Sequence, residues 1–295
     1  MSRTSGLAAR ILSPATAVLL FLQAAIVVTG GGVRLTGSGL GCPTWPECTP
    51  GSYVPVKGQA EGHLHSWIEF SNRLLTFVLV LAALVTLIAV FRARRADLRF
   101  LAAGQFLGIF GQGVLGGITV LTHLNPISVA SHFLLSTILI AAAASLYSRR
   151  VKPARKKISP RTTDVFSRVH VLVSALVVIL GTIVTGAGPH AGDINAPRLH
   201  IRIQSAALMH GVAVVVLLLL TVAFFVSKET SELTKKRLAI FALLSLSQGA
   251  IGLIQYIQGV PELLVATHLA GSTLVWISAW SIWLSVQRQE MEQER

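Results

Sequence analysis

The stretch QGVLGGITVLTHLNPISVASHFLLST, residues 112–137, decides the fold because the chain repeats it as QGAIGLIQYIQGVPELLVATHLAGST, residues 248–273. The two copies start 248 − 112 = 136 positions apart, and their histidines, His132 and His268, are separated by the same 136 positions. A constant offset is the mark of a duplicated structural unit. An imidazole inside an apolar helix costs free energy unless it has a partner. The repeat therefore predicts two equivalent sites, one in each half of the chain.

The composition is that of an integral membrane protein. Of the 295 residues, 53% are hydrophobic and 13% are charged, and the mean hydropathy is +0.68. The hydrophobic share and the hydropathy are higher, and the charged share is lower, than in a soluble globular protein. The net charge of +13 does not indicate a nucleic-acid partner, because the basic residues lie between apolar runs rather than along one face.

Eight apolar runs are each long enough to cross about 30 Å of hydrocarbon at about 1.5 Å per residue. We place them near residues 13–33, 66–90, 98–120, 127–148, 169–187, 204–226, 237–257 and 262–285. The fold class is therefore all-α, with eight transmembrane helices.

The eight runs fall into two sets of four. We predict an N-terminal four-helix bundle over 1–148, a basic cytoplasmic linker over 149–168 that contains Lys156 and Lys157, and a C-terminal four-helix bundle over 169–295. Because each half has an even number of spans, both halves enter the membrane in the same direction. This is a parallel repeat, and it predicts two pseudo-symmetric four-helix bundles.

The distribution of Lys and Arg predicts the orientation. One side of the membrane holds both termini and 25 − 5 = 20 of the 25 basic residues. The other side holds only Arg34, Lys57, Arg73, Arg198 and Arg202. We therefore expect a multi-pass protein of the cell membrane with both termini in the cytoplasm.

Cys42 and Cys48 lie in the first outer loop, where a thiol pair this close is expected to be oxidised. Two roles stay open for this disulfide. It is either a structural staple for a small loop or a redox-labile bond of the strained, exposed kind. The loop is long for a connection between helices, and covering the first site from water is one role for it.

In the second half, His210 and His268 lie at a similar depth, about 8–9 Å below the outer helix ends. Two opposed neutral imidazoles suit axial ligation of a haem iron. The alternative is that they are polar residues hydrogen-bonded across helices. The other histidines, His170 at the cytoplasmic start of the fifth span included, are expected to be solvated or interfacial.

In the first half, the residue at the depth of His210 is Asn72, and Glu69 shares its helix face. With His132 these residues form an asymmetric set. Such a set suits a reacting substrate that needs an open side and a nearby acid or base. Glu69 has an alternative role as a structural ion pair with Arg73, and His65 is an alternative ligand in place of Asn72.

These residues resemble the haem A synthase family over essentially the whole chain. The segments that carry the resemblance are Thr36–Cys42, Trp45–Cys48, Ile68–Arg73, Ser131–Phe133 and Thr267–Leu269. The resemblance implies an oxidoreductase that oxidises the C8 methyl group of haem O to a formyl group, giving haem A for terminal oxidases. It also implies haem O synthase and oxidase assembly factors as partners. The sequence leaves open whether the protein forms a homo-oligomer.

The resemblance also implies roles for individual residues. His210 and His268 would bind the iron of haem B in the second bundle, while Glu69 and His132 would act on haem O in the first. Independently of the resemblance, Arg73, Arg34 and Arg202 are three open candidates to bind a haem propionate. The chain departs from the family pattern Glu-x-x-His-Arg at Asn72. The iron of haem O is then held by His132 alone or together with His65.

Two other functions compete with haem oxidation. One is a haem-bearing membrane electron-transfer cytochrome with no haem-modifying activity. The other is a transporter built from parallel repeats, which would need polar groups at the middle of the membrane. The ionisable residues of the apolar runs lie instead near the outer ends, which counts against transport.

Overall fold

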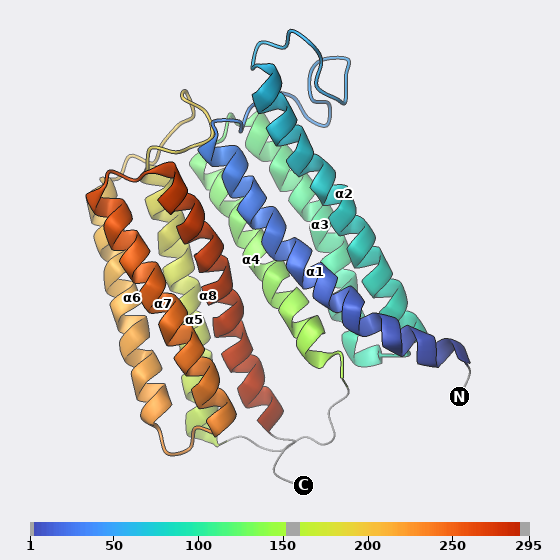
Figure 1. Ribbon diagram of the computed structural model, residues 1–295, viewed down its shortest axis with the longest axis vertical. Helices are drawn as coiled ribbons and strands as arrows, with labels where there is room; N and C mark the ends of the chain where they lie inside the picture. Colours follow the sequence, from blue (N-terminus) through green and yellow to red (C-terminus); the bar gives the residue numbers. More distant parts are fainter. Residues whose placement is uncertain (1–2, 152–159, 290–295) are drawn as a thin grey trace. The chain divides into compact units, whose positions relative to one another are not determined.

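The structure is a computed structural model that describes residues 3–151 and 160–289. Its helices are α1 (Arg3–Leu35), α2 (His63–Arg92), the short η1 (Ala96–Leu98), α3 (Arg99–Leu121), α4 (Pro126–Arg149), α5 (Arg161–Ala187), α6 (Ile203–Val226), α7 (Glu232–Ile257) and α8 (Glu262–Gln289) (Figure 1). Within the described residues, eight helices are long and apolar enough to cross a membrane. The predicted all-α fold with eight spans is therefore confirmed, and the chain is a multi-pass membrane protein.

Three helices begin five or more residues earlier than predicted. Helix α1 begins at residue 3 rather than 13, α5 at 161 rather than 169, and α7 at 232 rather than 237. The reason is that these first turns contain charged residues, which an apolar run excludes although a helix accommodates them. In α7 the Ser231 side chain caps the helix by accepting from the Thr234 amide at 3.3 Å. The remaining part of the predicted linker, with Lys156 and Lys157, falls at 152–159, outside the described residues.

The chain divides into two compact units. The first unit runs up to Arg150 and also includes Thr185–His200, and the second contains Val151–Val184 and the chain from Ile201 onward. In the first unit, each of α1 to α4 packs against two of the others, so that the four helices form a closed ring. A buried polar link crosses this bundle, since Gln23 donates to Gln105 at 2.8 Å and Gln105 donates to the Leu139 carbonyl at 2.5 Å.

The buried apolar core of each unit lies toward one end of its bundle. In the first unit the core consists of Leu12, Leu19, Leu79, Ala83, Ala89, Val90, Leu98, Ala102, Ile109, Ala143 and Leu146. In the second it consists of Leu217, Phe224, Leu238, Phe241, Ala279, Ile282 and Val286. On α2, α4, α6 and α8, these positions are at least seven residues from Asn72, His132, His210 and His268, or about 10 Å along a helix. The buried core therefore does not extend to the level of the candidate site residues.

Candidate functional site

Each odd-numbered long helix has a glycine that contacts a polar side chain of the helix that follows. The pairs are Gly30 with Asn72, Gly116 with His132, Gly181 with His210 and Gly252 with His268. A Cβ added to these glycines would lie 3.6, 3.4, 3.5 and 3.4 Å, respectively, from the nearest atom of the partner. The missing Cβ thus lets each side chain lie close against the neighbouring helix. We call these four pairs the glycine contacts.

Within each unit, the glycine contacts lie at a similar distance from the ends of their helices. Gly30, Gly116 and Gly252 lie five residues before the end of their helices, and Gly181 lies six residues before the end of α5. His132 and His268 each lie six residues after the first residue of their helix. In α4 this register is set by the Asn125 cap, whose side chain accepts from the Ile127 amide at 2.9 Å, and by Pro126 at the first turn. The sequence repeat is therefore also a repeat of side-chain placement.

In the second unit, both imidazoles have one nitrogen turned toward a neighbouring helix. His210 Nδ1 lies 3.1 Å from the carbonyl oxygen of Val177, four residues before Gly181. His268 Nδ1 is buried and faces α7, where a Cβ added to Gly252 would lie 3.8 Å from it. A haem-ligating histidine commonly presents one ring nitrogen to a backbone carbonyl, which leaves Nε2 for the metal.

The two histidines of the second unit lie at a similar distance from the ends of their helices. Both rings are half-buried, and Nδ1 of His268 is covered. The accessible part of the His268 ring is therefore on the side away from α7. Two imidazoles with this arrangement fit the axial coordination of a haem iron.

The first unit offers one imidazole and one amide at the same level. His132 is half-buried, and among the described residues nothing hydrogen-bonds to its buried Nδ1. Its backbone carbonyl accepts from Gln112 Nε2 at 3.2 Å. Asn72 contacts Gly30, and its Oδ1 accepts from the Thr29 hydroxyl at 2.7 Å. This half of the molecule therefore fits one axial ligand where the second unit fits two.

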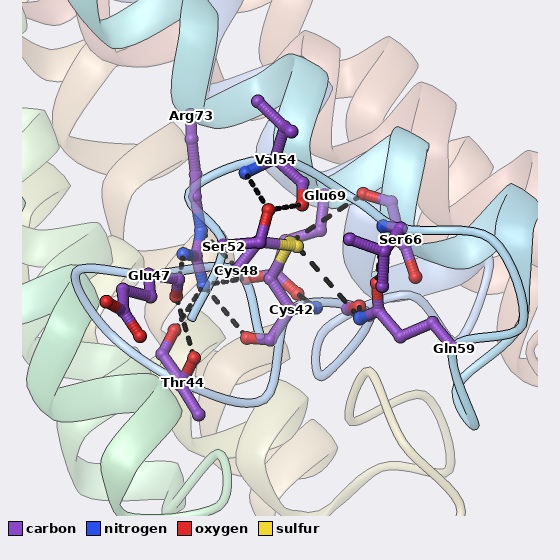
Figure 2. Close-up of a disulfide and its surroundings, with 12 residues drawn as sticks. Cys42, Thr44, Glu47, Cys48, Ser52, Val54, Gln59, Ser66, Glu69 and Arg73 are labelled. Atoms are coloured by element: carbon purple, nitrogen blue, oxygen red, sulfur yellow. Dashed lines mark hydrogen bonds and ion pairs between the residues drawn. A yellow bond between two sulfur atoms is a disulfide. The ribbon is translucent and has the colours of Figure 1, made fainter. Parts of the chain in front are cut away.

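Glu69 is buried, with 6% exposure, and both of its carboxylate oxygens are hydrogen-bonded. Oε1 accepts from Arg73 Nη2 at 2.7 Å and from Arg73 Nε at 3.2 Å, while Oε2 accepts from the Cys42 amide at 2.7 Å (Figure 2). The ion pair that the spacing suggested is present. The hydrogen bond that the Cys42 amide donates, however, also holds the carboxylate to the loop.

Arg73 holds the same loop through its carbonyl oxygens. It donates to Cys42 at 2.9 Å, to Thr44 at 3.1 Å and to Glu47 at 3.1 Å (Figure 2). Most of its donors are thus used inside the unit. Arg34 donates to the Thr185 carbonyl at 2.7 Å, and Arg202 is exposed.

The predicted bond between Cys42 and Cys48 is present. Of the two roles left open, an exposed bond does not match the structure, because both cysteines have 0% exposure. They are covered because Glu69 and Arg73 hold the loop against α2, and Gln59 donates to the Gly41 carbonyl at 2.7 Å. The loop also reaches α3, where a Cβ on Gly117 would lie 2.5 Å from the Trp45 ring. Gly117 adjoins Gly116, so Trp45 packs beside the His132 contact.

His65 does not lie at the level of Asn72. It is seven residues nearer the start of α2, or about 10 Å along the helix. Its Nδ1 lies 2.9 Å from the Ser38 hydroxyl of the loop after α1. The structure therefore places His65 with the loop and not with Gly30.

The expectation for His170 is wrong. It has 0% exposure, its Nε2 lies 3.1 Å from the Thr221 hydroxyl, and its ring centroid is 4.5 Å from that of Phe241. Because α5 begins eight residues earlier than predicted, His170 lies inside the bundle rather than at its edge.

The sequence analysis also did not identify the glycines of the glycine contacts, although Gly116 and Gly252 are part of the repeated stretch.

A family model described as cytochrome oxidase assembly protein, COX15-CtaA, matches residues 15–193. The chain is similar to proteins named heme A synthase from three bacteria. It is 29% identical over 181 residues to that of Shewanella oneidensis, which covers 57% of this chain and 54% of the relative. It is 31% identical over 114 residues to that of Geobacillus thermodenitrificans, covering 38% and 34%, respectively. It is 27% identical over 320 aligned positions to that of Azorhizobium caulinodans, covering 90% of each.

The chain spans between about a third and a half of the length of the first two of these relatives. The family model, in contrast, matches more than half of the chain and includes α1 to α5 with the disulfide loop, Glu69, Asn72 and His132. On this match, the chain belongs to the COX15-CtaA family of cytochrome oxidase assembly proteins.

Proposed function

We propose that this protein is a haem A synthase, a membrane oxidoreductase that converts the C8 methyl group of haem O into the formyl group of haem A. Written with water as the oxygen source, this conversion takes one oxygen atom from water and releases four protons and four electrons. An external acceptor must take the electrons. The proposal is supported by family membership and by the name of the relatives that the chain resembles.

The second unit would hold haem B through His210 and His268. When bound, haem B supplies one-electron redox chemistry. The contact of His210 Nδ1 with the Val177 carbonyl and the packing of the His268 ring against Gly252 would fix the ring orientations and leave Nε2 of each histidine for the iron. The buried apolar core of the second unit lies away from this level, so it does not occupy the place proposed for the cofactor.

The first unit would bind haem O as the substrate. His132 would bind its iron, and Glu69 would stabilise positive charge or accept a proton near the reacting carbon. Arg73 orients the Glu69 carboxylate at 2.7 Å and holds the loop that contains the disulfide. Binding of a propionate by Arg73 stays a prediction, because Glu69 and the loop carbonyls use most of its donors.

A single observation carries the proposal. The two units share one plan of glycine contacts, but among the described residues only the first unit adds a buried carboxylate near the level of its imidazole. A duplicated electron-transfer protein has no need of this difference. An enzyme with one substrate site and one cofactor site does.

The test is haem extraction from the purified full-length protein, produced together with a haem O synthase, with separation of haems B, O and A. Wild type is expected to yield haem B and haem A. Glu69→Gln, which keeps the shape and hydrogen-bonding capacity of the side chain, should keep haem B but accumulate haem O. His268→Ala should lose haem B, and the exposed His200→Ala serves as the control that changes neither. Haem B with unconverted haem O in wild type would instead favour the electron-transfer cytochrome.

A further inference from the structure

The fourth glycine contact differs from the other three in the side chain that it holds. Asn72 lies against Gly30 as His132, His210 and His268 lie against their glycines. We propose that the first unit holds the iron of its haem substrate through His132 alone, and that Asn72 keeps the opposite face of the iron open. This inference rests on the proposed function, because it takes haem O as the occupant of the first unit.

The position of Asn72 is fixed by two contacts on α1. Its Oδ1 accepts from the Thr29 hydroxyl at 2.7 Å, and its Nδ2 is the atom that a Cβ on Gly30 would approach, at 3.6 Å. Both polar atoms of the amide are thus turned toward the neighbouring helix. The Thr29 oxygen also lies 3.2 Å from the Ile26 carbonyl oxygen, and its single proton is directed to Asn72 at the shorter distance. The amide is therefore held back against α1 rather than extended into the bundle.

The amide is also a poor substitute for an imidazole in reach and in chemistry. The terminal atoms of asparagine are one bond closer to Cα than Nε2 of histidine, and here they are already hydrogen-bonded or packed. Imidazole is a common ligand of iron, whereas amide oxygens suit harder cations such as magnesium and calcium. Asn72 thus occupies the place of the second ligand without supplying one.

The neighbouring side chains do not supply the missing ligand. His65 lies about 10 Å further along α2 and contacts Ser38. Glu69 Oε1 accepts a hydrogen bond from Arg73, and Glu69 Oε2 accepts one from the Cys42 amide. The groups nearest to Asn72 along α2 are therefore committed to the loop.

A single axial ligand suits a molecule that must leave after reaction. Two strong iron–imidazole bonds retain a haem as a permanent cofactor, which is the role proposed for the second unit. One bond leaves a coordination position open and weakens retention of the product. The difference between Asn72 and His210 would thus separate the substrate site from the cofactor site.

The test is the spin state and carbon monoxide binding of the haems in the purified full-length protein, produced together with a haem O synthase. In wild type we expect a low-spin haem from the second unit and a high-spin haem that binds carbon monoxide after reduction. His132→Ala should remove the high-spin signal and leave the low-spin one. Asn72→His should convert the high-spin haem to low spin and abolish carbon monoxide binding, because Gly30 leaves room for the ring.

Two further variants test the competing ligands. Asn72→Ala is expected to keep the high-spin signal, whereas a change in coordination would show that the amide binds iron. A wild-type protein with two low-spin haems, or with no haem in the first unit, overturns the inference, and in the former case His65→Ala would identify His65 as the ligand. Extraction from the same samples separates the two proposals, since a high-spin haem O that is never converted contradicts the proposed function and leaves this inference standing.

Discussion

Replacement of Arg73 by alanine is expected to release the loop that contains the disulfide. In the native protein, Cys42 and Cys48 have 0% exposure, so a reductant reaches them only when the loop opens. The Arg73 guanidinium holds the loop closed through three carbonyl oxygens, those of Cys42, Thr44 and Glu47. Removal of this side chain shifts the opening equilibrium of the loop and leaves the disulfide itself unchanged.

The size of the effect follows from these three bonds. Each contributes about 1 kcal/mol net, or about 3 kcal/mol in total, because folding exchanges bonds to water for bonds within the protein. The Arg73 side chain is 21% exposed, so solvent competes for part of this and we discount it to about 2 kcal/mol. Since about 1.4 kcal/mol corresponds to a factor of ten, the open fraction should rise about 30-fold.

The assay is reduction by dithiothreitol in detergent, followed by pulse alkylation with a maleimide polymer and separation by gel mobility. The Arg73→Ala protein should be reduced about 30-fold faster than wild type, provided that opening is in rapid equilibrium. Arg73→Lys, which keeps the charge but lacks the forked geometry, should fall between the two. The control is Arg202→Ala, at an exposed arginine that should not matter. A rate for Arg73→Ala within about threefold of wild type, corresponding to less than about 0.7 kcal/mol, would refute this account of the loop.

Two further predictions concern the second unit. Gly252→Val should lower the haem B content about tenfold, because its side chain would displace the His268 ring, whereas Gly249→Val, where no atom lies within 4 Å of an added Cβ, should not. Haem B extraction from both proteins tests this, and equal losses would contradict the glycine contact. His170→Phe should change thermal stability but keep haem B, because His170 lies eleven residues before Gly181, about 16 Å along α5. Loss of haem B with an unchanged melting temperature would instead make His170 a ligand.

The sequence predicted the helices from their apolar runs, and it failed where a helix continues into charged residues. Hydropathy reports the part of a helix that lies in hydrocarbon, whereas the helix itself extends as far as its backbone hydrogen bonds continue. The misplaced start of α5 had a consequence for the side chains, because it put His170 at the membrane edge. The correct start places it beside Thr221 and Phe241.

The site was predictable where it repeats or follows helix geometry. The constant offset pointed to His132 and His268, and the i,i+4 spacing pointed to the pair of Glu69 and Arg73. The Cys42 amide could not be foreseen as a partner of Glu69, because the loop has no periodicity that fixes its path. The glycine contacts depend on which helices are neighbours in space. The sequence alone does not show which side chain of another helix a given glycine will contact.

The two units share a plan but differ in what surrounds it. Alignment of α2 with α6 on the glycine contacts places Asn72 at His210, an offset of 210 − 72 = 138. The same offset places Glu69 at Ala207 and Arg73 at Gly211, so the second unit lacks both the carboxylate and the arginine that hold the loop. A unit with two imidazoles, and with Ala207 and Gly211 in place of the carboxylate and the arginine, suits permanent retention of a cofactor. A unit with one imidazole, a buried carboxylate and a fastened loop suits a molecule that enters, reacts and leaves. The chemical difference between the halves thus lies in three positions of one helix face, where a duplicated bundle can change its task without changing its fold.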